Sequence, residues 1–142
     1  MFDWRKEMSL GFGSKCQLVA MDQDMVLYSY SSFNINLPNF EEYIDNLDGI
    51  LLISKKYFPQ PTIVKKRVRK PNKKKVWLEK KVYPEVDVNK LFQDGDIIIV
   101  NSSGCWEKNI NGIDREALHI LFSIKQKYIN SGEIPYEVTC FR

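Results

Sequence analysis

Residues 111–133 read NGIDREALHILFSIKQKYINSGE, and this stretch predicts the main helix of the chain. We expect the helix to run from Asp114 to Asn130. Asp114 suits the N-cap, because its carboxylate can accept the free backbone N–H groups of the first turn. Gly132 suits the left-handed residue that ends a helix, and Pro135 follows soon after. The rest of the fold is expected to pack around this element.

The apolar residues of this helix share one side, which covers about half of the circumference. At 100° per residue, that side collects Ile113, Ala117, Ile120, Leu121, Ile124 and Tyr128, with Leu118, Phe122 and Ile129 at its margin. A stripe of this width is wider than one neighbour usually covers. We therefore expect a sheet beneath the helix and a loop or second helix at its flank.

The polar side of the helix holds His119, the single histidine of the chain. As a catalytic base it would have Ser123 or Glu116 one turn away, but a nucleophilic site also needs an orienting group and shelter from water. The other candidate acids all stand in turn contexts: Asp45, Asp48, Asp94 and Asp96. We therefore expect a solvated histidine, no catalytic residue and no enzyme activity.

Length and composition indicate one ordinary globular domain, residues 1–142, with 44% hydrophobic residues. No apolar run is long enough for a transmembrane helix, and charges interrupt the start where a signal peptide needs an apolar core. The three cysteines, Cys16, Cys105 and Cys140, form no metal-ligand spacing with the single histidine. We expect a cytoplasmic protein without a metal site, a small-molecule cofactor or a membrane contact.

The net charge of +3 conceals an uneven distribution. Residues 65–81 hold ten Lys or Arg and one acid, Glu79, which gives +9. The rest of the chain holds 11 basic and 17 acidic residues, which gives −6. A mildly acidic body with one strongly basic element is expected to meet a partner through complementary charge.

Several stretches predict strands. Alternation and a short turn indicate a hairpin of Cys16–Met21 and Met25–Tyr30. Ile50–Ile53 is a continuous apolar run typical of a buried strand, and Ile97–Val100 reads as a central strand for the same reason. Tyr136–Phe141 alternates and is expected to be the last strand. The predicted class is α+β, with a mainly antiparallel sheet packed against the long C-terminal helix.

The basic element predicts a β-hairpin, Thr62–Tyr83, which lies at the edge of the body or projects from it. IVKKRVRK and KVWLEKKVY flank Pro71-Asn72, which marks the turn. Alternation sorts the side chains into two faces. One face holds Val64, Val68, Val76, Leu78 and Val82, which form core sets if the hairpin packs on the body. The other face carries the candidate partner-binding residues Lys65, Arg67, Arg69, Trp77, Lys81 and Tyr83, together with Glu79.

Three interpretations of the basic hairpin stay open. A two-stranded ribbon fits a major groove of DNA, and Trp77 and Tyr83 could stack on single-stranded bases. An acidic protein partner would suit the same charges. Lys and Arg also protect exposed strands from edge-to-edge pairing, which needs no partner at all.

A family resemblance rests on several segments of the C-terminal part: 111–114, the apolar pairs 117–118 and 121–122, Tyr128 and 132–135, with 36–39 and 48–49 earlier in the chain. In these segments the chain resembles small cytoplasmic bacterial immunity proteins of polymorphic, contact-dependent toxin systems. The resemblance implies a non-catalytic protein that neutralises one cognate toxin by direct binding. Inhibitors of nucleases usually present acidic surfaces that mimic nucleic acid. The basic hairpin therefore implies either a partner that is acidic at the contact or a contact made by the acidic body.

Overall fold

A computed structural model describes residues 11–72 and 74–141. Five strands form one sheet in the spatial order β6-β3-β2-β1-β7, and each neighbouring pair is antiparallel. The strands are β1 (Phe12–Met21), β2 (Met25–Asn34), β3 (Gly49–Ser54), β6 (Ile97–Val100) and β7 (Glu137–Phe141). A separate antiparallel pair joins β4 (Thr62–Arg69) and β5 (Lys75–Val82). The predicted α+β fold with a mainly antiparallel sheet is confirmed.

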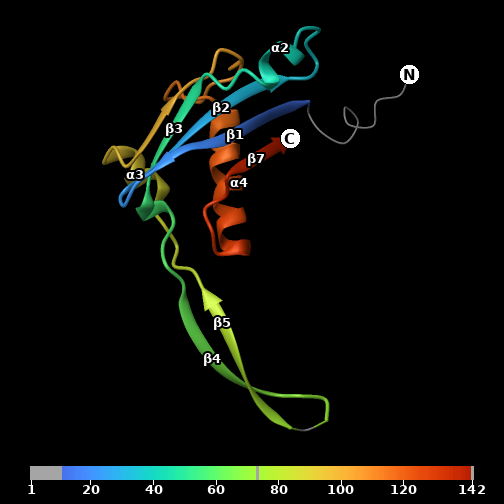
Figure 1. The fold of residues 1–142 in the computed structure, drawn as a ribbon, viewed down its shortest axis with the longest axis vertical. Coiled ribbons are helices and arrows are strands. Elements are labelled where there is room, and N and C mark those ends of the chain that lie inside the picture. The colour runs from blue at the N-terminus through green and yellow to red at the C-terminus, as the bar shows by residue number, and fades with distance from the viewer. Residues whose placement is uncertain (1–10, 73, 142) are drawn as a thin grey trace, which may run out of the picture.

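The long helix α4 (Arg115–Ser131) lies against one face of the sheet, as Figure 1 shows. Its ends are those that the sequence predicts. The Asp114 side chain accepts a hydrogen bond from the N–H of Glu116 at 3.0 Å, and Gly132 has a left-handed φ of 78°. The helix therefore begins and ends within one residue of its predicted limits.

The main core lies between α4 and the inner face of the sheet. Side chains from four strands meet the helix there: Cys16, Val26, Tyr28, Tyr30, Leu51, Ile53 and Val138. The short helix α3 (Val88–Gln93) covers the end of the sheet near β6 and contributes Leu91 to the same core. On α4 itself, Phe122 is 62% exposed. The expectation that a second element covers the margin of the apolar stripe is therefore wrong at Phe122.

The prediction that Ile97–Val100 is a central strand is wrong, because β6 is an edge strand. Only its inward residues are covered. Ile97 is buried, whereas Ile98 and Val100 are close to half exposed on the opposite, outer face. A short aliphatic run has the same sequence pattern in a central strand and in an edge strand whose outer face is exposed, so the pattern does not distinguish the two.

The outer face of the sheet carries an aliphatic patch over three strands. Register places Leu27 opposite Leu52, Leu52 opposite Ile98, and Ile50 opposite Val100, so these side chains share one face. We call Leu27, Ile50, Leu52, Ile98 and Val100 the outer patch. The small helix α2 (Glu41–Ile44) covers another end of this face, where Ser31 Oγ donates to the Ile44 carbonyl at 2.7 Å.

The β4–β5 hairpin stands away from the body (Figure 1). Every residue of β4 is exposed except Val68, and every residue of β5 is exposed except Val76, and these two are only partly buried. The five aliphatic residues proposed as core sets therefore do not enter the core. They form a face of their own, because the hairpin projects instead of packing on the sheet.

Candidate functional site

The free hairpin is the clearest candidate for a binding site, and its register defines two faces. Val68 lies opposite Val76, and Lys66 lies opposite Leu78. Directly opposed residues of an antiparallel pair point to the same side. We call Val64, Val68, Val76, Leu78 and Val82 the aliphatic face. Thr62, Lys66 and Lys80 stand between these residues on the same side.

The opposite side of the hairpin is the basic face. Register places Arg67 opposite Trp77 and Lys65 opposite Glu79. The guanidinium carbon of Arg67 lies 6.0 Å from the centroid of the Trp77 ring, at the outer limit of a cation–π contact. Lys65 Nζ lies 3.7 Å from Glu79 Oε1, and both side chains are mostly exposed, so this ion pair stabilises the hairpin little. The basic face consists of Lys65, Arg67, Arg69, Lys75, Trp77, Glu79 and Lys81.

Trp77 is the one large aromatic side chain of the basic face, and it is 66% exposed. Apart from Arg67, no described ring or charge is placed over it. An exposed Trp beside an Arg combines two of the residue types that most often dominate binding energy at protein interfaces. The centre of the basic face is therefore equipped to act as an anchor.

The structure separates Tyr83 from the other candidate residues. Tyr83 follows β5 and is partly buried, and its ring packs edge-to-face against Tyr128 of α4 with centroids 5.6 Å apart. Lys81 reaches the C-terminal end of α4: its Nζ lies 4.0 Å from the position that a Cβ atom on Gly132 would occupy. The end of α4 carries partial negative charge, which favours a lysine there. Lys65, Arg67, Arg69 and Trp77 line the free part of the hairpin, whereas Lys81 and Tyr83 belong to its root.

Tyr128 fixes the other leg of the hairpin to the same helix. Its hydroxyl donates to the carbonyl oxygens of Pro59 at 2.8 Å and of Phe58 at 3.3 Å. Its ring also meets the Phe58 ring, with centroids 5.2 Å apart. One side chain therefore contacts the chain entering the hairpin and, through Tyr83, the chain leaving it. The apolar position of Tyr128 on the helix is the one sequence feature that relates to this role.

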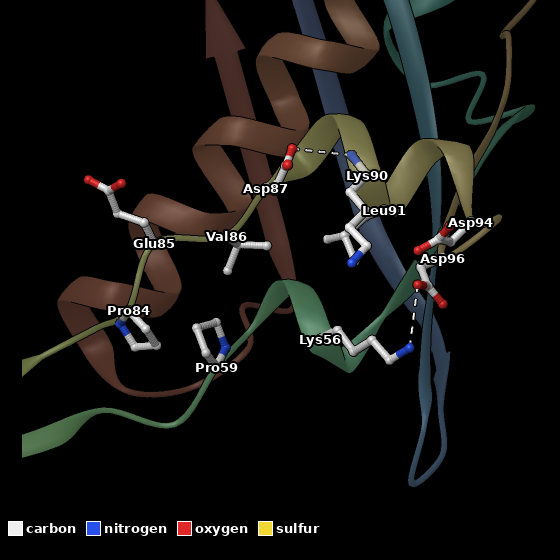
Figure 2. A pocket seen from close by; sticks show the side chains of 10 residues that line it. All are labelled: Lys56, Pro59, Pro84, Glu85, Val86, Asp87, Lys90, Leu91, Asp94 and Asp96. Carbon is white, nitrogen blue, oxygen red and sulfur yellow. Dashed lines mark hydrogen bonds and ion pairs between the residues drawn. The ribbon is translucent and has the colours of Figure 1, made fainter.

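A cavity of about 410 Å³ lies at the root of the hairpin, between its two legs and α3. Figure 2 shows Pro59 and Pro84 on the legs and a group of charged side chains along α3 and before β6. Two of the carboxylates already have partners. Asp87 accepts from the Lys90 N–H at 3.2 Å, and Asp96 lies 3.5 Å from Lys56 Nζ. Within residues 11–72 and 74–141, no group of three or more His, Cys, Asp or Glu side chains could hold a metal ion.

The most densely connected polar groups lie inside the body, around Asp114. The Tyr30 hydroxyl donates to Asp114 Oδ2 at 2.9 Å and accepts from the Ser102 N–H at 3.0 Å. Ser32 Oγ lies 3.5 Å from Asp114 Oδ1. Burial raises the pKa of the Asp114 carboxyl, and these hydrogen bonds oppose that shift. Asp114, Tyr30 and Ser32 are fully buried, so this network joins α4 to the sheet and presents no group to a substrate.

His119 lies exposed on α4, as the sequence predicts. In the described part of the chain, no helix is long and apolar enough to cross a membrane. Comparison with family models, with curated proteins and with solved structures finds no match to this chain.

Proposed function

We propose that this chain is a non-catalytic binding protein of the cytoplasm that neutralises a cognate toxin by direct protein–protein contact through the basic face. The observation that carries the proposal is the position of this face. Lys65, Arg67, Arg69 and Trp77 stand on a hairpin that the body does not cover. A projecting hairpin can enter a cleft that a flat surface cannot, and such a shape is suited to occluding an active site.

The composition of the basic face favours a protein partner with an acidic contact surface. Arg and Trp are enriched among the residues that dominate protein interfaces, and Arg67 and Trp77 lie together at the centre of this face. Glu79 lies beside them and would repel a phosphate backbone. Complementary charge would steer the partner to the hairpin and raise the association rate. The resemblance of the C-terminal part to immunity proteins supports a toxin as that partner.

Co-expression with each toxin encoded beside the gene tests the proposal. The wild-type chain is expected to protect the cell and to co-purify with one toxin. A variant carrying Arg67→Glu and Trp77→Ala is expected to lose both properties, because it removes the central pair of the basic face. Lys108→Glu is the matched control, since it reverses an exposed charge on the body. Unchanged toxicity with every neighbouring toxin would overturn the proposal.

Nucleic-acid binding is the second candidate, and the exposure of Trp77 on a two-stranded basic ribbon favours it. Fluorescence anisotropy with random single- and double-stranded DNA and RNA separates the two candidates. Measurements at about 50 and 200 mM salt span the range over which several phosphate contacts lose orders of magnitude in affinity. A steep salt slope that Lys65→Glu, Arg67→Glu and Arg69→Glu abolish would favour nucleic acid. No binding to any of these nucleic acids at the lower salt concentration would exclude this second candidate and leave an acidic protein as the expected partner.

A further inference from the structure

Two aliphatic β-surfaces of this chain have no partner within the described residues. One is the aliphatic face of the hairpin, where Val64, Leu78 and Val82 are each 43% exposed or more. The other is the outer patch of the sheet, where Ile50, Ile98 and Val100 are each 41% exposed or more. Contiguous exposed apolar surface of this kind marks an interaction site. A two-stranded hairpin with an open apolar face is also only marginally stable by itself.

The two surfaces cannot meet within one chain in this arrangement. The hairpin runs away from the sheet, and its tip is the part farthest from the body (Figure 1). Its root is held to α4 through Tyr128 and Tyr83, so the hairpin cannot fold back without releasing these contacts. A hairpin strand of eight residues spans about 26 Å, which is enough to reach across the sheet of a second molecule.

We propose that two copies of the chain exchange hairpins, so that the aliphatic face of each hairpin packs on the outer patch of the other copy. The dimer has two-fold symmetry, because each copy contributes the same hairpin and binds the partner's hairpin on the same patch. Face-to-face packing of two β-surfaces buries the side chains of both in a layer about 10 Å thick. The proposal concerns the face opposite to the basic face and goes beyond the proposed function.

Charge complementarity selects a second copy's body as the occupant. The hairpin segment 65–81 carries +9, and the rest of the chain carries −6. Lys66 and Lys80 stand on the aliphatic face. Asp22 borders a shallow cavity beside Leu27 and Leu52 of the outer patch, and Asp96 directly precedes β6. Lys56 already contacts Asp96, so the attraction comes from the whole surface and not from one ion pair. Packing of hairpin against hairpin would instead bring two strongly basic segments together.

The exchange leaves the basic face outward. Arg67 and Trp77 point away from the aliphatic face, and they would stay accessible on both hairpins of the dimer. Toxin neutralisation and dimerisation would therefore fail separately when either face is changed.

Light scattering after size exclusion measures the mass of the wild-type chain over a wide range of concentration. The expected mass is twice the 16.7 kDa of one chain, and the dimer should weaken as salt rises. Leu78→Glu and Ile98→Glu are each expected to weaken the dimer by about 100-fold or more, because each replaces an apolar side chain of the contact by a carboxylate that must lose its water on association. Trp77→Glu is the matched control. It makes the same charge change one residue away on the opposite face and should leave the dimer intact.

A cysteine pair tests the exchange without introducing charge. Leu78→Cys and Ile98→Cys are made in separate chains, mixed and oxidised. The mixture is expected to give a disulfide-linked dimer joining the hairpin of one chain to the sheet of the other, above the level that either variant gives alone. Circular dichroism of each variant distinguishes loss of the contact from loss of the fold.

Three results would overturn the proposal. The first is a wild-type monomer at every concentration. The second is a dimer that survives both Leu78→Glu and Ile98→Glu, which would place the contact elsewhere. The third is a dimer that Leu78→Glu breaks and Ile98→Glu does not, combined with the absence of a cross-link in the cysteine mixture. That result would show that the hairpin takes part in the dimer contact but does not pack on the outer patch.

Discussion

The hydroxyl of Tyr128 donates a hydrogen bond to the carbonyl oxygen of Pro59 at 2.8 Å, and this contact ties the start of the hairpin to the long helix. The same ring packs against Tyr83 on the chain that leaves the hairpin. One residue of α4 therefore holds both legs. The hairpin projects from a partly buried root that is hydrogen-bonded to α4, even though the strands of the hairpin are open to solvent.

Replacing Tyr128 by Phe should loosen this root. The ring stays and the hydroxyl is lost, so the free energy of unfolding is expected to fall by about 1 kcal/mol. Hydrogen exchange should become faster in peptides that span residues 58–61 and 83–86. Tyr136→Phe is the control, because Tyr136 is 65% exposed and should change neither quantity. Equal hydrogen-exchange rates of these peptides in the wild type and in Tyr128→Phe would contradict the proposed role of the Tyr128 hydroxyl.

Replacing Asp114 by Ala should destabilise the protein far more than the same change at another helix start. Asp114 is buried and accepts from Tyr30, Ser32 and the Glu116 N–H, so its loss leaves buried donors without a partner. We expect a loss of about 2 to 4 kcal/mol. Asp87→Ala is the control, since Asp87 caps α3 at an exposed position and should cost about 1 kcal/mol. Urea denaturation measures both values, and similar losses would contradict the account of the buried network.

The buried carboxyl of Asp114 should also make stability depend on pH. Burial raises the pKa of Asp114 above its ordinary value of 3.8, so the folded state holds this proton more tightly than the unfolded state. The contribution is therefore fully present below pH 3.8 and is lost as pH rises toward the folded pKa. Asp114→Asn has no titrating group there. The stability of the wild type relative to Asp114→Asn should fall as pH rises through this window, and a difference that stays constant or grows would contradict the shift.

The elements with local signals could be predicted from the sequence. The limits of α4 follow from Asp114 and Gly132, each of which supplies a bond or a backbone conformation that helix ends need. The first hairpin follows from alternation around Asp22–Asp24, and Asp22 accepts the N–H groups of Asp24 and Met25 within that turn. These features depend on residues close together in the chain, so the sequence alone could indicate them.

The order of strands and the position of the basic hairpin could not be predicted in the same way. Ile97–Val100 has the composition of a central strand, yet the topology places it at an edge. The valines of the hairpin have the spacing of a core face, yet the legs carry the hairpin away from the sheet. Both outcomes depend on contacts between distant segments, such as Tyr128 with Pro59. Lys66 and Lys80 among the valines were the available sign that this face is not a core.

The sorting of the hairpin into two faces could be predicted, because a period of two needs no tertiary information. Lys65, Arg67, Arg69, Trp77 and Lys81 fall on one face, as the alternation indicates. Tyr83 departs from this pattern since β5 ends at Val82 and the chain then turns toward α4. The alternation therefore places Tyr83 on the basic face only if β5 continues past Val82, and the sequence does not indicate where this strand ends.

Toxin binding through the basic face is tested most directly by the affinity of the purified chain for its cognate toxin. Calorimetry measures this affinity for the wild type and for a triple variant that combines Lys65→Glu, Arg67→Glu and Arg69→Glu. These three residues point outward from the free strand, so the variant should keep the melting temperature of the wild type. The affinity of the variant is expected to be lower by about 100-fold or more, since charge reversal at a complementary contact costs several kcal/mol. Equal affinity in the two proteins would contradict binding through the basic face and would place the contact on the acidic body.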